Sequence, residues 1–217
     1  MNGLVKVGHY RREFAVDIER LFENALDWEH LPHLHGDSFS AIEIVTADRE
    51  GWRSTVTLDD GRTMALNLAL TESGWVTRTE AGGELLSEIR TTAAAAGPER
   101  CTVSVTFHVA AQSAERNAAA GAYFERLYAT LYDDDERMMI ARTEAKRRSA
   151  EEWRRTRDVT LADGRTFAVP LYCPHQGLPL DAKPDAEGII TCPWHGYRFD
   201  VATGDNVSGQ TCGWQRR

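Results

Sequence analysis

Hydrophobic and polar side chains alternate along most of the first 110 residues, and this period of two predicts β-strands. The pattern is weak in segment 7–17 and clearer in five later segments, 39–47, 51–70, 74–81, 83–95 and 101–110. The Asp-Asp-Gly sequence at 59–61 is a favourable tight turn, so segment 51–70 is expected to form a hairpin. This half of the chain is therefore rich in antiparallel strands.

Apolar side chains at helical spacing replace the alternation in two places. Segment 17–35 has Asp17 as a plausible N-cap, and Pro32 should end or kink the helix. A second helix is expected from about Ala118, with an apolar stripe through Phe124, Leu127, Tyr128, Leu131, Met138 and Met139. The charged segment 144–158 that follows is typical of a solvated helix end or linker.

The last sixty or so residues differ, because they hold short strands and turns with almost no helical period. We therefore expect two domains, residues 1–157 and residues 158–217. A hydrophobic content of 42% is enough for packed cores, and a net charge of −8 argues against a nucleic-acid partner. Neither a secretory signal nor a transmembrane segment is visible, so we expect a cytoplasmic protein without a membrane partner, whose four cysteines are reduced or bind metal.

The strongest chemical signal is a pair of mixed clusters, Cys173-x-His175 and Cys192-x-x-His195. Structural zinc sites usually take cysteines and histidines as like pairs. A mixed pair in each loop instead suits two metals bridged by sulfide, as in a [2Fe–2S] centre where two histidines ligate one iron. Gly177 and Gly196 would let the backbone turn tightly behind the ligands. Zinc and a chance grouping are the alternatives.

The sequences CPHQGLPL and CPWHGYRFDVATG closely resemble the two cluster loops of the Rieske family. This resemblance implies a [2Fe–2S] cluster on Cys173, His175, Cys192 and His195. Leu178 and Trp194 occupy the positions of the extra disulfide of high-potential members, which implies the lower-potential type found in ferredoxins and oxygenases. Cys101 and Cys212 are expected to be ordinary free cysteines.

A second constellation lies in ENALDWEHLPHLH, which contains Asp27, His30, His33 and His35. On a helix Asp27 and His30 would share a face, so the carboxylate could orient the imidazole of a metal ligand. His30 and His35 diverge on an unbroken helix, but Pro32 between them makes shared ligation feasible. Two histidines with one carboxylate form the facial triad of non-haem Fe(II) sites.

The candidate carboxylate is in the run Asp133-Asp134-Asp135. On a helical wheel with Leu131 at zero, Asp135 lies at about +40°, inside the apolar stripe, and Asp134 lies at its edge, at about −60°. Asp133 lies on the far side. A buried acid is costly unless it is paired or binds a cation, so Asp135 is the preferred ligand and Asp134 the alternative. The competing interpretation is a solvated charge run.

These motifs together resemble Rieske non-haem iron oxygenases, in which Asp-x-x-His-x-x-x-x-His supplies two iron ligands and a helical Asp the third. The resemblance implies an α+β chain: a helix-grip, START-like antiparallel sheet with a long C-terminal helix, plus a small, truncated all-β Rieske domain. It implies mononuclear Fe(II) on His30, His35 and Asp135, with Asp27 coupling the two centres and His33 not a ligand. The order of domains is reversed relative to the family, and the chain is shorter.

By the same resemblance we expect a ferredoxin or reductase as electron donor, a small organic substrate, O₂, and a homo-oligomer. The expected reaction is hydroxylation or demethylation. The alternative is a Rieske electron carrier fused to a ligand-binding helix-grip domain that holds no second iron.

Overall fold

The computed structural model of the chain describes residues 3–58 and 60–214. The chain divides into two compact units, one that ends at Met139 and one that begins at Ile140. This division follows packing, whereas the predicted domains 1–157 and 158–217 follow sequence pattern. The two differ in which domain receives the end of the long helix and the charged segment after it.

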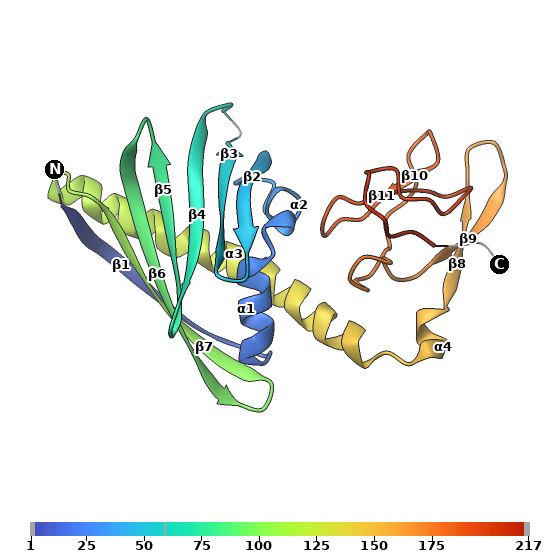
Figure 1. Ribbon diagram of the computed structural model, residues 1–217, viewed down its shortest axis with the longest axis horizontal. Helices are drawn as coiled ribbons and strands as arrows, with labels where there is room; N and C mark the ends of the chain where they lie inside the picture. Colours follow the sequence, from blue (N-terminus) through green and yellow to red (C-terminus); the bar gives the residue numbers. More distant parts are fainter. Residues whose placement is uncertain (1–2, 59, 215–217) are drawn as a thin grey trace. The chain divides into compact units, whose positions relative to one another are not determined.

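The first unit is built on a seven-stranded antiparallel sheet in the order β1-β7-β6-β5-β4-β3-β2 (Figure 1). Strands β2 to β7 follow each other as a meander, and β1 pairs with β7 at the far edge. The strands are β1 (Leu4–Phe14), β2 (Ala41–Asp48), β3 (Gly51–Thr57), β4 (Thr63–Thr71), β5 (Gly74–Ala81), β6 (Glu84–Gly97) and β7 (Arg100–Ala110).

The later strands confirm the alternating pattern. The first strand was predicted at 7–17 but lies at Leu4–Phe14, and Asp17 is the N-cap of α1. Of the turn predicted at 59–61, Asp59 lies outside the described residues; on either side of it, Leu58 and Arg62 close the hairpin with a hydrogen bond of 2.9 Å. Alternation along β7 buries every second side chain. The buried set is Cys101, Val103, Val105, Phe107 and Val109.

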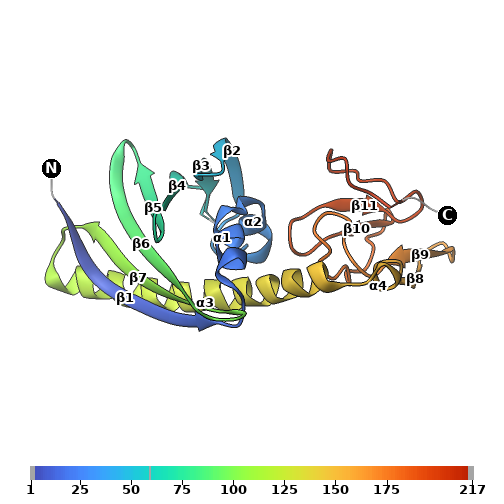
Figure 2. The same cartoon turned by 60° about the horizontal axis from the view of Figure 1, so that its bottom comes forward.

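Helix α3 (Ala114–Arg147) lies across the curved sheet, so the first unit has the expected helix-grip architecture (Figure 2). Its inward side chains Phe124, Tyr128, Tyr132 and Met139 pack into the same core as the strands. Helix α3 and strand β1 approach each other closely at Gly121, where a Cβ would lie 2.2 Å from the carbonyl oxygen of Val7.

Segment 17–35 is divided among α1 (Ile18–Leu26), a 3₁₀ turn η1 (Trp28–His30) and α2 (Leu31–Leu34). Asp17 is the predicted N-cap, and its side chain accepts from the backbone N–H of Arg20 at 2.7 Å. The prediction that Pro32 ends or kinks the helix was wrong. The helix stops earlier, at Asp27, and Pro32 stands in the first turn of α2, where its missing N–H costs nothing.

The second unit holds two small hairpins, β8 (Thr156–Thr160) with β9 (Thr166–Pro170) and β10 (Ile189–Thr191) with β11 (Arg198–Asp200). The unit also contains residues 140–147 of α3 and the short helix α4 (Ala150–Trp153), which precede the predicted domain 158–217. Within residues 158–214 the structure has strands and no helix, as predicted for that domain. Its core gathers Val159, Val169, Leu180, Ile190, Phe199 and Val201.

No helix within the described residues is long and apolar enough to cross a membrane.

Candidate metal centres

The two Cys/His loops of the second unit share one backbone pattern. In the first loop Cys173 N–H donates to the carbonyl of Leu178, and the carbonyl of Cys173 accepts from Gly177, both at 2.8 Å. In the second loop Cys192 N–H donates to Tyr197 at 2.8 Å, and Gly196 donates back to Cys192 at 2.9 Å. Each loop therefore closes over its cysteine in the same way.

The two loop glycines adopt the conformation that the sequence predicted. Gly177 and Gly196 have φ of 78° and 67°, in the left-handed region that side chains disfavour. Each glycine lies shortly after the histidine of its loop, and its positive φ lets the backbone reverse direction there.

The four ligand-type side chains come together across the loops. Cys173 and Cys192 are buried, and their thiols lie close enough to interact: a hydrogen bond between them raises the pKa of Cys173 and lowers that of Cys192 to about 7. The rings of His175 and His195 stand 4.9 Å apart at 90°. The set thus offers two sulfurs and two imidazoles, which is the donor set of a [2Fe–2S] centre with mixed ligands.

Sequence reasoning missed the residues that cover the first loop. The charged segment 144–158 was interpreted as a solvated helix end or linker, but the Arg148 guanidinium lies 3.5 Å from the centre of the Tyr172 ring. Arg148 also donates to the carbonyl of Gly177, and Arg142 donates to the carbonyl of Gln176. Together the two guanidinium groups contact the cluster loop and the residue before it, which no periodicity could have revealed.

A separate triad forms in the first unit from the residues predicted as iron ligands. His35 Nε2 lies 3.0 Å from Asp135 Oδ1, and His30 Nε2 lies 3.3 Å from the same oxygen. All three residues are buried, and the three candidate ligand atoms lie within 4.8 Å of one another. His30 ends η1, His35 follows α2 and Asp135 lies on α3, so three elements converge on one point.

Mutual pairing determines the charges in this triad. Burial alone would raise the pKa of Asp135, but hydrogen bonds to His30 and His35 outweigh it and hold that pKa well below its usual range. Burial alone would lower the pKa of His30, but the hydrogen bond and charge of Asp135, with the charge of Asp27 added, raise it. The site therefore favours a carboxylate facing positive charge.

The donor set fits a mononuclear metal. Two neutral imidazoles and a carboxylate converging through Nε2, Nε2 and Oδ1 are the ligands of non-haem Fe(II) sites. In such a site the Nδ1 atom of each histidine keeps its proton. His30 has a backbone hydrogen bond to Asp27, whereas Nδ1 of His35 is buried without a hydrogen-bond partner among the described residues and lies 3.9 Å from Asp134 Oδ2. A small shift would give Asp134 this proton to accept.

The neighbouring acids have different positions. Asp133 is largely exposed and pairs with Arg12, and Asp134 is partly exposed and pairs with Arg137, which matches the helical wheel. Asp27 is the C-cap of α1 with ψ of 77°, so the premise that it shares a helical face with His30 was wrong. Helix α1 ends at Leu26, and the 3₁₀ turn η1 begins at Trp28. His33 is exposed, apart from the triad.

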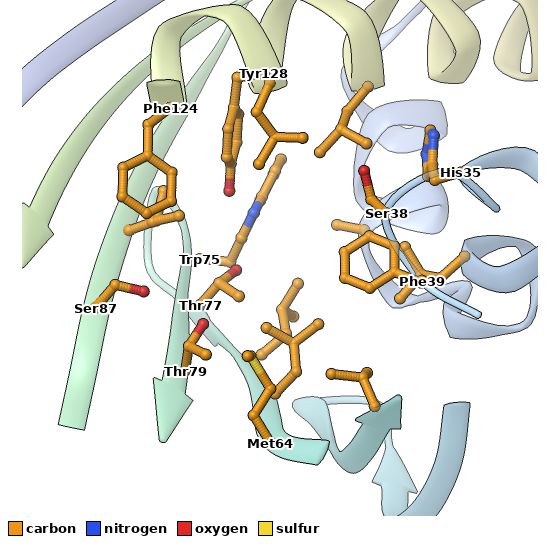
Figure 3. A pocket seen from close by; sticks show the side chains of 18 of the residues that line it. His35, Ser38, Phe39, Met64, Trp75, Thr77, Thr79, Ser87, Phe124 and Tyr128 are labelled. Carbon is orange, nitrogen blue, oxygen red and sulfur yellow. The ribbon is translucent and has the colours of Figure 1, made fainter. Parts of the chain in front are cut away.

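A cavity of about 540 Å³ adjoins the triad. It lies between the sheet and α3, and Asp27, His30, His35 and Asp135 are among its lining residues. Most of the wall is apolar or aromatic, including Phe39, Met64, Trp75, Phe124 and Tyr128 (Figure 3). Concave, mainly apolar cavities with a few polar groups are typical of small-molecule sites.

Comparison with known proteins identifies the second half of the chain. Residues 130–213 match the family model of the Rieske [2Fe–2S] domain, and the matched segment contains all four ligands in the two loops. The chain thus carries a Rieske domain, which implies a [2Fe–2S] cluster and indicates electron transfer.

Two curated relatives match a shorter stretch. Apoptosis-inducing factor 3 of mouse and of human are each 42% identical over 43 residues, which is 20% of this chain and 7% of the relative. The chain therefore corresponds to a small part of these proteins.

Solved structures resemble the first unit at low identity. Norcoclaurine synthase from Thalictrum flavum has a TM-score of 0.47 at 17% identity, covering 63% of this chain and 88% of the other. A START superfamily protein from Mycobacterium smegmatis has a TM-score of 0.49 at 16% identity, covering 62% and 99%. The Zhui aromatase/cyclase from Streptomyces sp. R1128 has 0.47 at 13%, covering 68% and 98%.

Proposed function

We propose that this chain is a Rieske-type non-haem iron oxygenase that hydroxylates or demethylates a small organic molecule. Cys173, His175, Cys192 and His195 would hold the [2Fe–2S] cluster, which would supply electrons from a ferredoxin or reductase, and His30, His35 and Asp135 would hold a mononuclear Fe(II). That iron, when bound, supplies the activation of O₂. The observation that carries the proposal is the second ligand set, buried beside an apolar cavity in a chain that already has a Rieske domain.

The residues of the triad have separate tasks in this proposal. Asp135 would supply the one negatively charged ligand of a divalent cation, and its lowered pKa keeps the carboxylate ionised at neutral pH. His30 and His35 must be neutral to bind metal, and the pKa of His30 is raised by Asp135, so metal binding would compete with protons and weaken as the pH falls. Burial excludes water from the side of the metal that faces the protein.

Asp27 has a coupling role in the proposal. It borders the cavity, its charge acts on His30, and a carboxylate beside an imidazole can accept or return a proton as that imidazole changes its charge. We propose that it links electron arrival to proton movement at His30.

The test is the content of iron, zinc and acid-labile sulfide per chain in anaerobically purified protein, before and after addition of Fe(II). The expected result is about three irons with about two sulfides. About two irons with two sulfides, unchanged by added Fe(II), would favour an electron carrier fused to a ligand-binding domain. Zinc without sulfide would contradict both.

A variant separates the two centres. His30→Ala should lose the mononuclear iron and all substrate turnover, while the visible spectrum of the cluster is retained. His33→Ala, with an exposed histidine changed nearby, is the matched control and should keep both irons and activity. Oxygenation of substrate by His30→Ala would refute the proposal.

A further inference from the structure

The mainly apolar cavity beside the triad has a polar patch on the strands of the sheet, and this patch indicates the kind of molecule that fits. Polar side chains on other elements also line the cavity, among them Asn24, Ser38 and Tyr132. The patch consists of the hydroxyls of Thr77, Thr79 and Ser87. Thr77 and Thr79 are two apart on β5, so they face the same side, and Thr79 is paired directly with Ser87 on β6. The three hydroxyls therefore form a compact group.

Ser87 is buried, with 5% of its surface exposed, and Thr77 and Thr79 are half-buried. A polar group in an apolar wall is costly unless something pairs with it, so the patch is suited to a ligand atom. Figure 3 shows it on the side of the cavity away from His35, with Trp75, Phe124 and Tyr128 nearby. The polar patch thus lies away from His35, whose candidate ligand atom is within 4.8 Å of those of His30 and Asp135.

The charge of the lining restricts the ligand further. The cavity lining contains neither lysine nor arginine among the described residues, and its formal negative charges, Asp27 and Asp135, belong to the triad end. A carboxylate at the hydroxyl patch would lose its hydration with only neutral donors in return. An ammonium group at the patch would have no carboxylate to compensate its charge. An uncharged oxygen, as in an alcohol, phenol or ketone, can be satisfied fully because hydroxyls both donate and accept.

We propose that the cavity binds an uncharged, mainly apolar molecule whose hydroxyl or carbonyl oxygen pairs with Thr79 and Ser87, and whose opposite end faces His30, His35 and Asp135. The binding stands on the cavity alone, while oxidation at that opposite end depends on the proposed function. The cavity volume suits a ligand of drug size.

The test is isothermal titration of the full-length, cluster-containing protein with two matched probes, 4-cyclohexylphenol and 4-cyclohexylbenzoate. The phenol should bind, and the benzoate should bind at least about tenfold more weakly because its charge is not compensated. Thr79→Val, which keeps the shape of the side chain, should weaken binding of the phenol about fivefold to tenfold. Thr71→Val changes an exposed threonine outside the cavity and should have no effect.

Three results would overturn this inference: equal binding of the two probes, no binding of the phenol, or unchanged phenol affinity in Thr79→Val when circular dichroism shows that the variant is folded. His30→Ala distinguishes it from the proposed function. Phenol binding should survive in His30→Ala, which is expected to lose the mononuclear iron. Wild-type protein that binds the phenol but takes up no mononuclear iron would refute the oxygenase and leave the binding inference intact.

Discussion

His35 Nε2 lies 3.0 Å from Asp135 Oδ1, although the two residues are one hundred positions apart in the sequence. The contact joins the segment after α2 to the middle of α3. It involves a buried carboxylate, whose desolvation is costly unless a positive charge or a bound cation compensates it. The proposed iron site of the first unit depends on this pairing.

Asp135→Asn should therefore abolish binding of the mononuclear iron, with a loss of affinity greater than about 100-fold, because the only buried carboxylate of the triad is removed. Asp134→Asn is the matched control on the adjacent residue. It should weaken iron binding by no more than about tenfold, since Asp134 is partly exposed and pairs with Arg137. Iron titration of the two variants measures both. Equal losses would mean that Asp135 is not the ligand.

Arg148→Gln should lower the reduction potential of the cluster by about 20–60 mV, because a positive charge beside the ligand loop stabilises the more negative, reduced cluster. Arg148 is held on the ring of Tyr172 and on the Gly177 carbonyl, so its charge has a fixed position. Arg154→Gln removes the same charge from an exposed side chain nearby and should change the potential less. Redox titration followed by visible absorption makes the comparison, and equal shifts would show a general charge effect only.

Gly121→Ala should destabilise the first unit by about 1–3 kcal/mol and lower its Tm. In a helix this substitution normally stabilises, by roughly 0.5–1 kcal/mol, so the sign of the effect is diagnostic. A Cβ at 121 would lie 2.2 Å from the Val7 carbonyl oxygen, which forces β1 and α3 apart. Gly3→Ala, where no atom lies within 4 Å of the added Cβ, should leave Tm unchanged. Thermal unfolding followed by circular dichroism decides, and a stabilised Gly121→Ala variant would contradict the close contact.

Glu88 should contribute stability that disappears in acid. Its side chain is 6% exposed, and although burial raises its pKa, hydrogen bonds from Arg78 and Arg90 outweigh burial and hold the pKa below 4.5. A lowered pKa stabilises the folded state above pH 4.5, and this stabilisation is lost as pH falls through the folded-state pKa.

Glu88→Gln should accordingly be less stable than the wild type at neutral pH and lose less stability on acidification to about pH 3. Urea unfolding at the two pH values measures the difference. Glu84→Gln changes an exposed glutamate on the same strand and should reproduce the wild-type pH dependence. An unchanged acid dependence in Glu88→Gln would show that another carboxylate is responsible.

Much of the architecture could be predicted because the relevant signals are local. Alternation along β7 places Val103, Val105 and Phe107 on one face whatever the rest of the chain does. The stripe on α3 likewise put Asp135 among buried side chains before any tertiary contact was known. The two cluster loops were readable for the same reason, since each holds its Cys, His and Gly within five consecutive residues.

Other features were beyond prediction because they depend on contacts between distant segments. Segment 17–35 has enough helical spacing for one helix, yet the chain breaks at Asp27, so that η1 and α2 turn His30 and His35 toward α3. The charged run near Arg148 has no apolar period, and only the folded second unit shows its guanidinium on Tyr172.

The sequence by itself determined which residues are capable of binding metal and which faces of the strands and helices are buried, because ligand chemistry and periodicity are properties of neighbouring residues. Only the tertiary structure decided that His30, His35 and Asp135 share one point, and that Thr77, Thr79 and Ser87 form a single patch within a cavity. Those relationships are set by the curvature of the sheet and the position of α3 across it, which no short stretch of the chain encodes.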